Sequence, residues 1–101
     1  MALERCLSKD GKTLTIKLDD KFDFGKVKYF KDAYSSDVED VQQVIIDLVN
    51  TDYMDSSALG MLLNMQKKLG GQVNNFKIIN TNDKVAKILE ISRFDKKFDI
   101  S

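Results

Sequence analysis

Three short polar residues, Asp55, Ser56 and Ser57, are the part of the chain whose types and spacing point to chemistry. An apolar β-branched run precedes them and a helix-periodic segment follows, so a helix is predicted to begin here. The first backbone N–H groups of a helix have no partner inside it, and a short oxygen-bearing side chain accepts a hydrogen bond from one of them. The same N–H groups and the positive end of the helix dipole favour an anion on a nearby hydroxyl. The junction is therefore a candidate phosphate site, with an ordinary helix cap as the alternative.

The segment from Val44 to Leu69 supplies the elements that position this junction. Its first residues are typical of a buried strand, and the residues after position 57 repeat with the period of a helix. At about 100° per residue, the leucines of this helix fall on one stripe that is predicted to face the core, made of Leu59, Leu62, Leu63 and Leu69. Neighbouring apolar residues widen the arc to about 200°, more than the roughly 100° that a core-facing helix needs.

The extra width of this apolar arc predicts contacts for a partner protein. Met61 shares its edge of the helix with polar residues that are expected to face solvent, and exposed methionines are adaptable contacts. The candidate partner-binding residues are Met54, Ala58, Met61 and Met65. The alternative is that both helix methionines pack against a neighbouring helix.

Strands and helices are predicted to alternate along the chain. The strands are expected at Leu3–Leu7, Thr13–Leu18, Val44–Leu48 and Phe76–Ile79, with residues 94–100 as a last edge strand or packed tail. Helices are expected at residues 26–35, from about residue 57 to 69, and from about 83 to 91. Helices that return the chain between parallel strands cover the sheet and make right-handed crossovers. We therefore expect one α/β or α+β domain over residues 1–101, a mixed sheet of four or five strands with about three helices packed on it.

Two polar loops follow strands of this predicted sheet, at residues 19–25 and 50–57. Functional loops gather at the carboxyl ends of strands in such sheets. The two loops are expected to lie side by side if their strands are neighbours. Asp23 in the first loop then either caps the helix that follows it or faces the loop that carries Ser56.

Composition narrows the function classes. The 16 basic residues balance 16 acidic ones and are spread along the chain, which disfavours a nucleic-acid partner. No apolar run approaches the roughly 20 residues of a membrane span, and a secretion signal is not recognisable, so a cytoplasmic protein without a membrane partner is expected. The chain has no histidine, the usual base of a serine nucleophile and the commonest zinc ligand, and Cys6 is its single cysteine. No enzyme activity, metal or cofactor is predicted.

The strand and the Asp-Ser-Ser-x-Leu-Gly motif at residues 55–60 resemble the signature of the STAS-domain anti-sigma factor antagonist family. The resemblance extends over nearly the whole chain, including the early hairpin, the loop at Phe22 and Asp23, and the two glycines after the central helix. The sequence departs from the family pattern at Ala58, where the family usually has glycine, and at Ser101, beyond which many members carry a C-terminal helix.

The resemblance implies a phosphorylation-controlled docking switch. In that family the serine directly after the aspartate is phosphorylated by a partner kinase of the histidine-kinase-like ATPase type that doubles as an anti-sigma factor. A PP2C-type phosphatase removes the phosphate. Carried over to this chain, the phosphorylated residue is Ser56, and its surroundings are Asp23, Asp55 and Ser57.

Three other functions compete with this hypothesis. A serine-nucleophile enzyme would need a base that the sequence does not place. A phosphoaspartate receiver would use Asp47 near the end of a central strand, although the first strand lacks the acidic pair that such domains use for magnesium. A constitutive STAS accessory subunit would bind a transporter ATPase without being phosphorylated.

Overall fold

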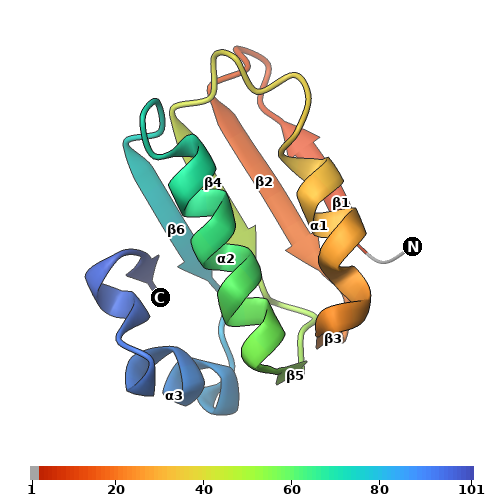
Figure 1. Ribbon diagram of the computed structural model, residues 1–101, viewed down its shortest axis with the longest axis vertical. Coiled ribbons are helices and arrows are strands. Elements are labelled where there is room, and N and C mark those ends of the chain that lie inside the picture. The colour runs from red at the N-terminus through yellow and green to blue at the C-terminus, as the bar shows by residue number, and fades with distance from the viewer. Residues whose placement is uncertain (1–2) are drawn as a thin grey trace.

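A five-stranded mixed sheet organises residues 3–101, the part of the chain that the computed structural model describes (Figure 1). Its strands, in spatial order, are β1 (Leu3–Leu7), β2 (Thr13–Leu18), β4 (Gln43–Asp47), β6 (Asn75–Ile79) and β7 (Asp99–Ile100). Strands β1 and β2 are antiparallel, and every other neighbouring pair is parallel. The helices are α1 (Val27–Ala33), α2 (Ser56–Leu69) and α3 (Asp83–Ile91), with 3-10 turns η1 (Phe24–Lys26) and η2 (Phe94–Lys96). The predicted mixed sheet with three helices is confirmed, and the C-terminal tail ends in strand β7.

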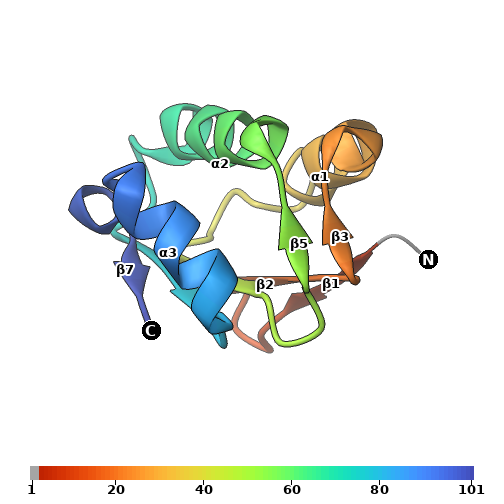
Figure 2. The same ribbon diagram turned by 90° about the horizontal axis from the view of Figure 1, so that it is seen from below.

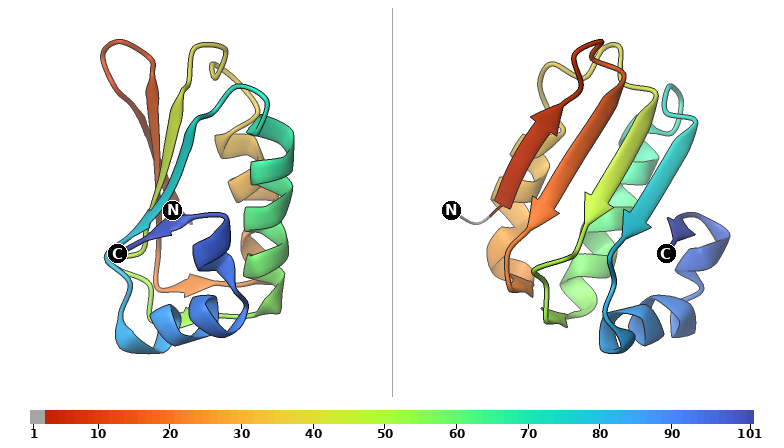
Figure 3. Two further views of the ribbon diagram at one scale, coloured as in Figure 1. Left: turned by 90° about the vertical axis from the view of Figure 1, so that its left-hand side faces the viewer. Right: turned by 180° about the vertical axis from the view of Figure 1, so that it is seen from behind.

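Alternating side chains give the sheet one core face. Ile16, Ile46 and Ile78 are register partners across β2, β4 and β6, and all three are fully buried. Burying each side chain of this size stabilises the fold by about 1.5–3 kcal/mol. The residues between them point to the opposite face and are only partly buried. Figure 3 shows that α1 and α2 both lie on one side of the sheet, so the core sits between that side and these helices.

Helices α1 and α2 run side by side over this core face, and α3 lies at the carboxyl ends of the strands (Figures 1 and 3). Phe30 of α1 packs its ring 5.3 Å from that of Phe22 and 5.7 Å from that of Tyr34, measured between centroids. No helix within residues 3–101 combines the length and the apolar character needed to cross a membrane.

A second, two-stranded parallel sheet was not anticipated by the sequence. It pairs β3 (Lys21–Phe22) with β5 (Tyr53–Met54), and Phe22 is in register with Met54. These strands continue the chain beyond β2 and β4, which are themselves parallel neighbours. Figure 2 shows β3 and β5 lying together and leading into α1 and α2. The expectation that the two polar loops lie side by side is therefore confirmed.

The buried face of α2 differs from the predicted one. Its buried residues are Ala58, Met61, Leu62, Met65 and Leu69. Leu63, which was assigned to the core stripe, is 37% exposed, and Leu59 is half-buried.

The solvent exposure expected at the Met61 edge of α2 is wrong, and the alternative that both helix methionines pack inside the fold holds. All four side chains are buried: Met54, Ala58, Met61 and Met65. Helix α1 covers the flank that was expected to face solvent, since Lys68, on the same edge of α2 as Met61, places its Nζ 6.0 Å from the ring centroid of Tyr34 at the end of α1. The methionines thus pack in the core that holds α2 in place.

Candidate functional site

The β3–β5 ladder is the platform on which the candidate site is built. The backbone N–H of Asp52 donates to the carbonyl oxygen of Asp20 at 2.8 Å, and that of Asp55 donates to the carbonyl oxygen of Phe22 at 3.3 Å. Phe22 and Met54 turn their side chains into the core. The ladder therefore fixes the start of α1 and the start of α2 relative to each other.

Each strand of the ladder is followed by an aspartate that caps a helical segment. Asp23 accepts a hydrogen bond from the backbone N–H of Gly25 at 3.0 Å and caps η1. Asp55 accepts a hydrogen bond from the backbone N–H of Ala58 at 3.2 Å and caps α2. Of the alternatives left open by the sequence, both aspartates adopt the capping role. Because Phe22 and Met54 are in register, the two carboxylates also occupy corresponding positions directly after two paired strands of the same chain.

Ser56 is the first residue of α2, and its side chain is exposed. A group attached to its hydroxyl would stand in the field of unpaired N–H groups at the start of a 14-residue helix, which favours an anion. Ser57, the lesser candidate, is half-buried. The cap of the helix and the candidate phosphosite are thus two neighbouring residues with separate roles.

The exposed face of α2 begins at Ser56 and runs along the helix through Gly60, Leu63 and Lys67. These residues are spaced by four, three and four positions, which places them on one side of an α-helix. A Cβ atom added at Gly60 would meet no heavy atom within 4 Å, so its surroundings are open. A partner can approach the helix backbone closely at this point, one turn beyond Ser56.

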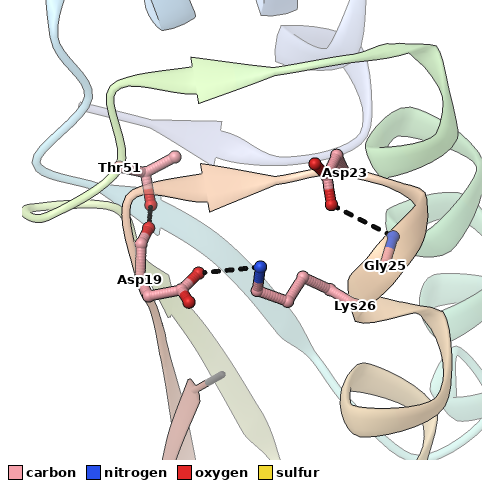
Figure 4. Close-up of polar contacts among 5 residues, drawn as sticks. All are labelled: Asp19, Asp23, Gly25, Lys26 and Thr51. Atoms are coloured by element: carbon pink, nitrogen blue, oxygen red, sulfur yellow. Dashed lines mark hydrogen bonds and ion pairs between the residues drawn. The ribbon is translucent and has the colours of Figure 1, made fainter. Parts of the chain in front are cut away.

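A buried threonine ties the loop of the site to its neighbours (Figure 4). Thr51 is 2% exposed, and its hydroxyl donates to the carbonyl oxygen of Asp19 at 2.8 Å. Its own carbonyl oxygen accepts a hydrogen bond from Nδ2 of Asn82 at 3.2 Å, while Oδ1 of Asn82 caps α3. On the other side, Nζ of Lys26 lies 3.2 Å from Oδ1 of Asp19. The sequence did not indicate a role for Thr51, because a lone threonine in a loop carries no periodic signal.

Asp47, the residue that a receiver domain would phosphorylate, forms hydrogen bonds that connect two turns. Its Oδ1 accepts hydrogen bonds from the backbone N–H of Val49 and from Nδ2 of Asn80, both at 3.0 Å. The carboxylate thereby joins the turn after β4 to the turn after β6. Within residues 3–101, no cluster of three or more histidine, cysteine or acidic side chains is arranged to hold a metal ion.

Comparisons with known proteins define the class to which this arrangement belongs. The family model described as STAS domain matches residues 7–101. A STAS-domain containing protein of Pseudomonas aeruginosa (strain UCBPP-PA14) is 42% identical over 101 residues, which cover all of both chains. The chain therefore belongs to the STAS domain family, as the motif at residues 55–60 indicated.

Solved structures of anti-sigma factor antagonists have a fold similar to that of this chain. The anti-sigma factor antagonist SpoIIAA in its unphosphorylated form matches with a TM-score of 0.76 and 18% identity, over 99% of this chain and 87% of that one. The phosphorylated form of SpoIIAA from Bacillus gives a TM-score of 0.75 at 19% identity, over 99% and 91%. An anti-sigma factor antagonist from Mycobacterium paratuberculosis matches with a TM-score of 0.78 and 17% identity, over 97% of this chain and 84% of that one. The fold is that of the anti-sigma factor antagonists.

Proposed function

We propose that this chain is a regulatory protein that binds a serine kinase when unmodified and is released when Ser56 is phosphorylated. The observation that carries the proposal is the exposed Ser56 side chain at the first position of α2, directly after a capping aspartate. Membership of the STAS domain family and the anti-sigma factor antagonist fold support it.

The charges around Ser56 supply a physical basis for release. A phosphate adds about −1.5 to −2 charges at pH 7. Asp55 directly precedes Ser56, and Asp23 stands at the corresponding place on the adjacent strand, so the added charge enters an already acidic surface. Docking would also remove the phosphate from water, which is costly. Each 1.4 kcal/mol of such differential cost weakens binding about tenfold.

The helix terminus acts in the opposite direction on the free protein. The unpaired N–H groups and the dipole at the start of α2 stabilise the phosphate by about 0.3–1 kcal/mol when no partner is bound. The modified chain is therefore stable alone and disfavoured in the complex. We assign the kinase role to an anti-sigma partner of the histidine-kinase-like ATPase type and the removal of phosphate to a PP2C-type phosphatase, on the strength of the family.

The experiment that tests this proposal is intact-mass and phosphopeptide analysis of the protein purified from its own cells, with and without phosphatase treatment. The expected result is one phosphate on Ser56 that phosphatase removes. A Ser56→Ala chain should carry none, and a Ser57→Ala chain should keep it. An unmodified Ser56 across growth conditions would contradict the proposal and favour the constitutive accessory subunit, for which Ser56→Asp and Ser56→Ala differ little.

A further inference from the structure

Phe24 occupies the place on η1 that Ser56 occupies on α2. Each residue lies two positions beyond the register pair Phe22–Met54, follows a capping aspartate, and begins a helical segment. Phe24 is 73% exposed, which is unusual for so large an apolar side chain. The ladder thus presents an uncovered aromatic ring on the element adjacent to the phosphosite.

Phe24 is part of a larger apolar surface. Val27, three residues later and therefore on the same side of the helical segment, is 39% exposed. On the neighbouring helix, Leu63 lies on the same face as Ser56. The starts of α1 and α2 lie next to each other in Figure 2. The exposed residues at these two starts define one docking face, made of Phe24, Val27, Ser56 and Gly60.

The charges at the ends of this docking face differ in sign. At the Ser56 end, the two loops carry five aspartates, of which Asp19 pairs with Lys26 and four have no ion pair within residues 3–101. Those four aspartates are Asp20, Asp23, Asp52 and Asp55. Lys21 is the lysine of these loops without an ion pair in the same residues. At the other end of α2, Lys67 and Lys68 are exposed. A complementary partner is basic around Ser56 and acidic toward the end of α2.

We infer that Phe24 is the anchor by which the Ser56 kinase recognises this chain. The ring fills an apolar socket that is bordered by basic side chains on the kinase, and Val27 contributes a second apolar contact beside it. Aromatic residues that become fully buried at the centre of an interface contribute a large share of binding energy. The inference rests on the proposed function and adds the residue that determines which kinase docks.

Ile91 provides a matched control for exposure. It ends α3 and is 71% exposed, nearly the same fraction as Phe24, but it belongs to neither of the helical segments that follow β3 and β5. Both residues can be replaced without disturbing the core, because most of each side chain already contacts solvent. A difference between the two positions therefore reports on the docking face and not on apolar exposure in general.

The first experiment is photocrosslinking in the native cells with p-benzoylphenylalanine at position 24 or at position 91. The expected product at position 24 joins this chain to a protein that, once purified, phosphorylates Ser56 from ATP. Its yield should fall at least about tenfold in a Ser56→Asp background, and position 91 should not give it. A product that joins two copies of this chain, a yield that persists with Ser56→Asp, or equal products at both positions would overturn the inference.

Steady-state phosphorylation of purified chains by that kinase gives the second readout. Phe24→Ala should raise KM at least about tenfold with little change in kcat, while Ile91→Ala should match the unsubstituted chain. Equal KM values for the two variants, with Ser56 still phosphorylated, would overturn this inference and leave the proposed function standing. If Ser56 carried no phosphate in the unsubstituted chain, both the proposed function and the inference about Phe24 would be contradicted.

Discussion

Asp23 and Asp55 each directly follow one member of the register pair Phe22–Met54, and each caps the helical segment that begins at the next residue. This repeated geometry sets two helix starts side by side and places one capping carboxylate directly before each of them. The capping role and the charge of Asp55 act on different properties, the stability of α2 and the electrostatics of the site, and substitutions can separate them.

Substitution of Asp55 distinguishes these two roles. Asp55→Ala removes the acceptor for the backbone N–H of Ala58 and should lower the free energy of unfolding by about 0.5–2 kcal/mol. Asp55→Asn keeps a capping oxygen and should cost much less. Urea denaturation at neutral pH measures both. If the asparagine variant lost as much stability as the alanine variant, charge and not capping would be the main contribution.

Two adjacent leucines test which face of α2 is buried. Leu62 is fully buried, so Leu62→Ala should destabilise the fold by about 2–5 kcal/mol through lost burial and the cavity it leaves. Leu63 lies on the exposed face, and Leu63→Ala should change stability by no more than about 0.5 kcal/mol. Thermal unfolding followed by circular dichroism separates the two. Similar losses would mean that α2 packs as the leucine stripe had predicted.

Thr51 should matter more than its loop position suggests. Thr51→Val keeps the shape of the side chain but leaves the carbonyl oxygen of Asp19 without its donor, at a cost of about 1–3 kcal/mol. Hydrogen exchange of backbone amides should become faster in residues 19–26 and 50–55, which the threonine joins. Thr15→Val, on the uncovered face of β2, serves as the control and should leave exchange in both loops unchanged.

Burial of Tyr34 predicts a loss of stability in alkali. Desolvation raises the pKa of the Tyr34 hydroxyl above its ordinary value of about 10. The neutral phenol is therefore favoured in the folded state, and its contribution is complete below pH 10 and lost as the pH rises through the folded-state pKa. Tyr34→Phe should reduce the decline of the unfolding free energy above about pH 10.

The exposed Tyr29 is the control for this pH dependence. Tyr29→Phe should leave the alkaline decline as it is in the unsubstituted chain. Denaturant unfolding at a series of pH values between about 8 and 11 measures both variants. Parallel curves for Tyr34→Phe and the unsubstituted chain would show that this hydroxyl does not contribute.

The main elements were predictable because their hydrophobic periods are long enough to read. Alternation over Thr13–Leu18 and the β-branched run at Val44 each indicated a buried strand, and the Asp-Ser-Ser junction indicated the start of α2. The two-residue strands β3 and β5 were missed because so short a segment has no measurable period. Their pairing depends on where β2 and β4 direct the chain, which is a tertiary effect.

The orientation of α2 was the main error about the site. Helical spacing identifies which residues share a face, but it does not say which side of a wide apolar arc a neighbouring helix will cover. Here the sheet and α1 cover Met61 and Met65, while Leu63 stays 37% exposed. The sequence likewise did not single out Phe24, because its position opposite Ser56 on the adjacent helix start follows from the unpredicted β3–β5 ladder.

The measurement that tests the central claim most directly is the dissociation constant of the Ser56 kinase for this chain, unmodified and phosphorylated on Ser56. Phosphorylation is predicted to weaken binding at least about tenfold. Ser56→Asp should also weaken binding, whereas the Ser56→Ala chain should bind like the unmodified chain. Equal dissociation constants for the unmodified and phosphorylated forms would contradict the account, since Ser56 would then not control docking.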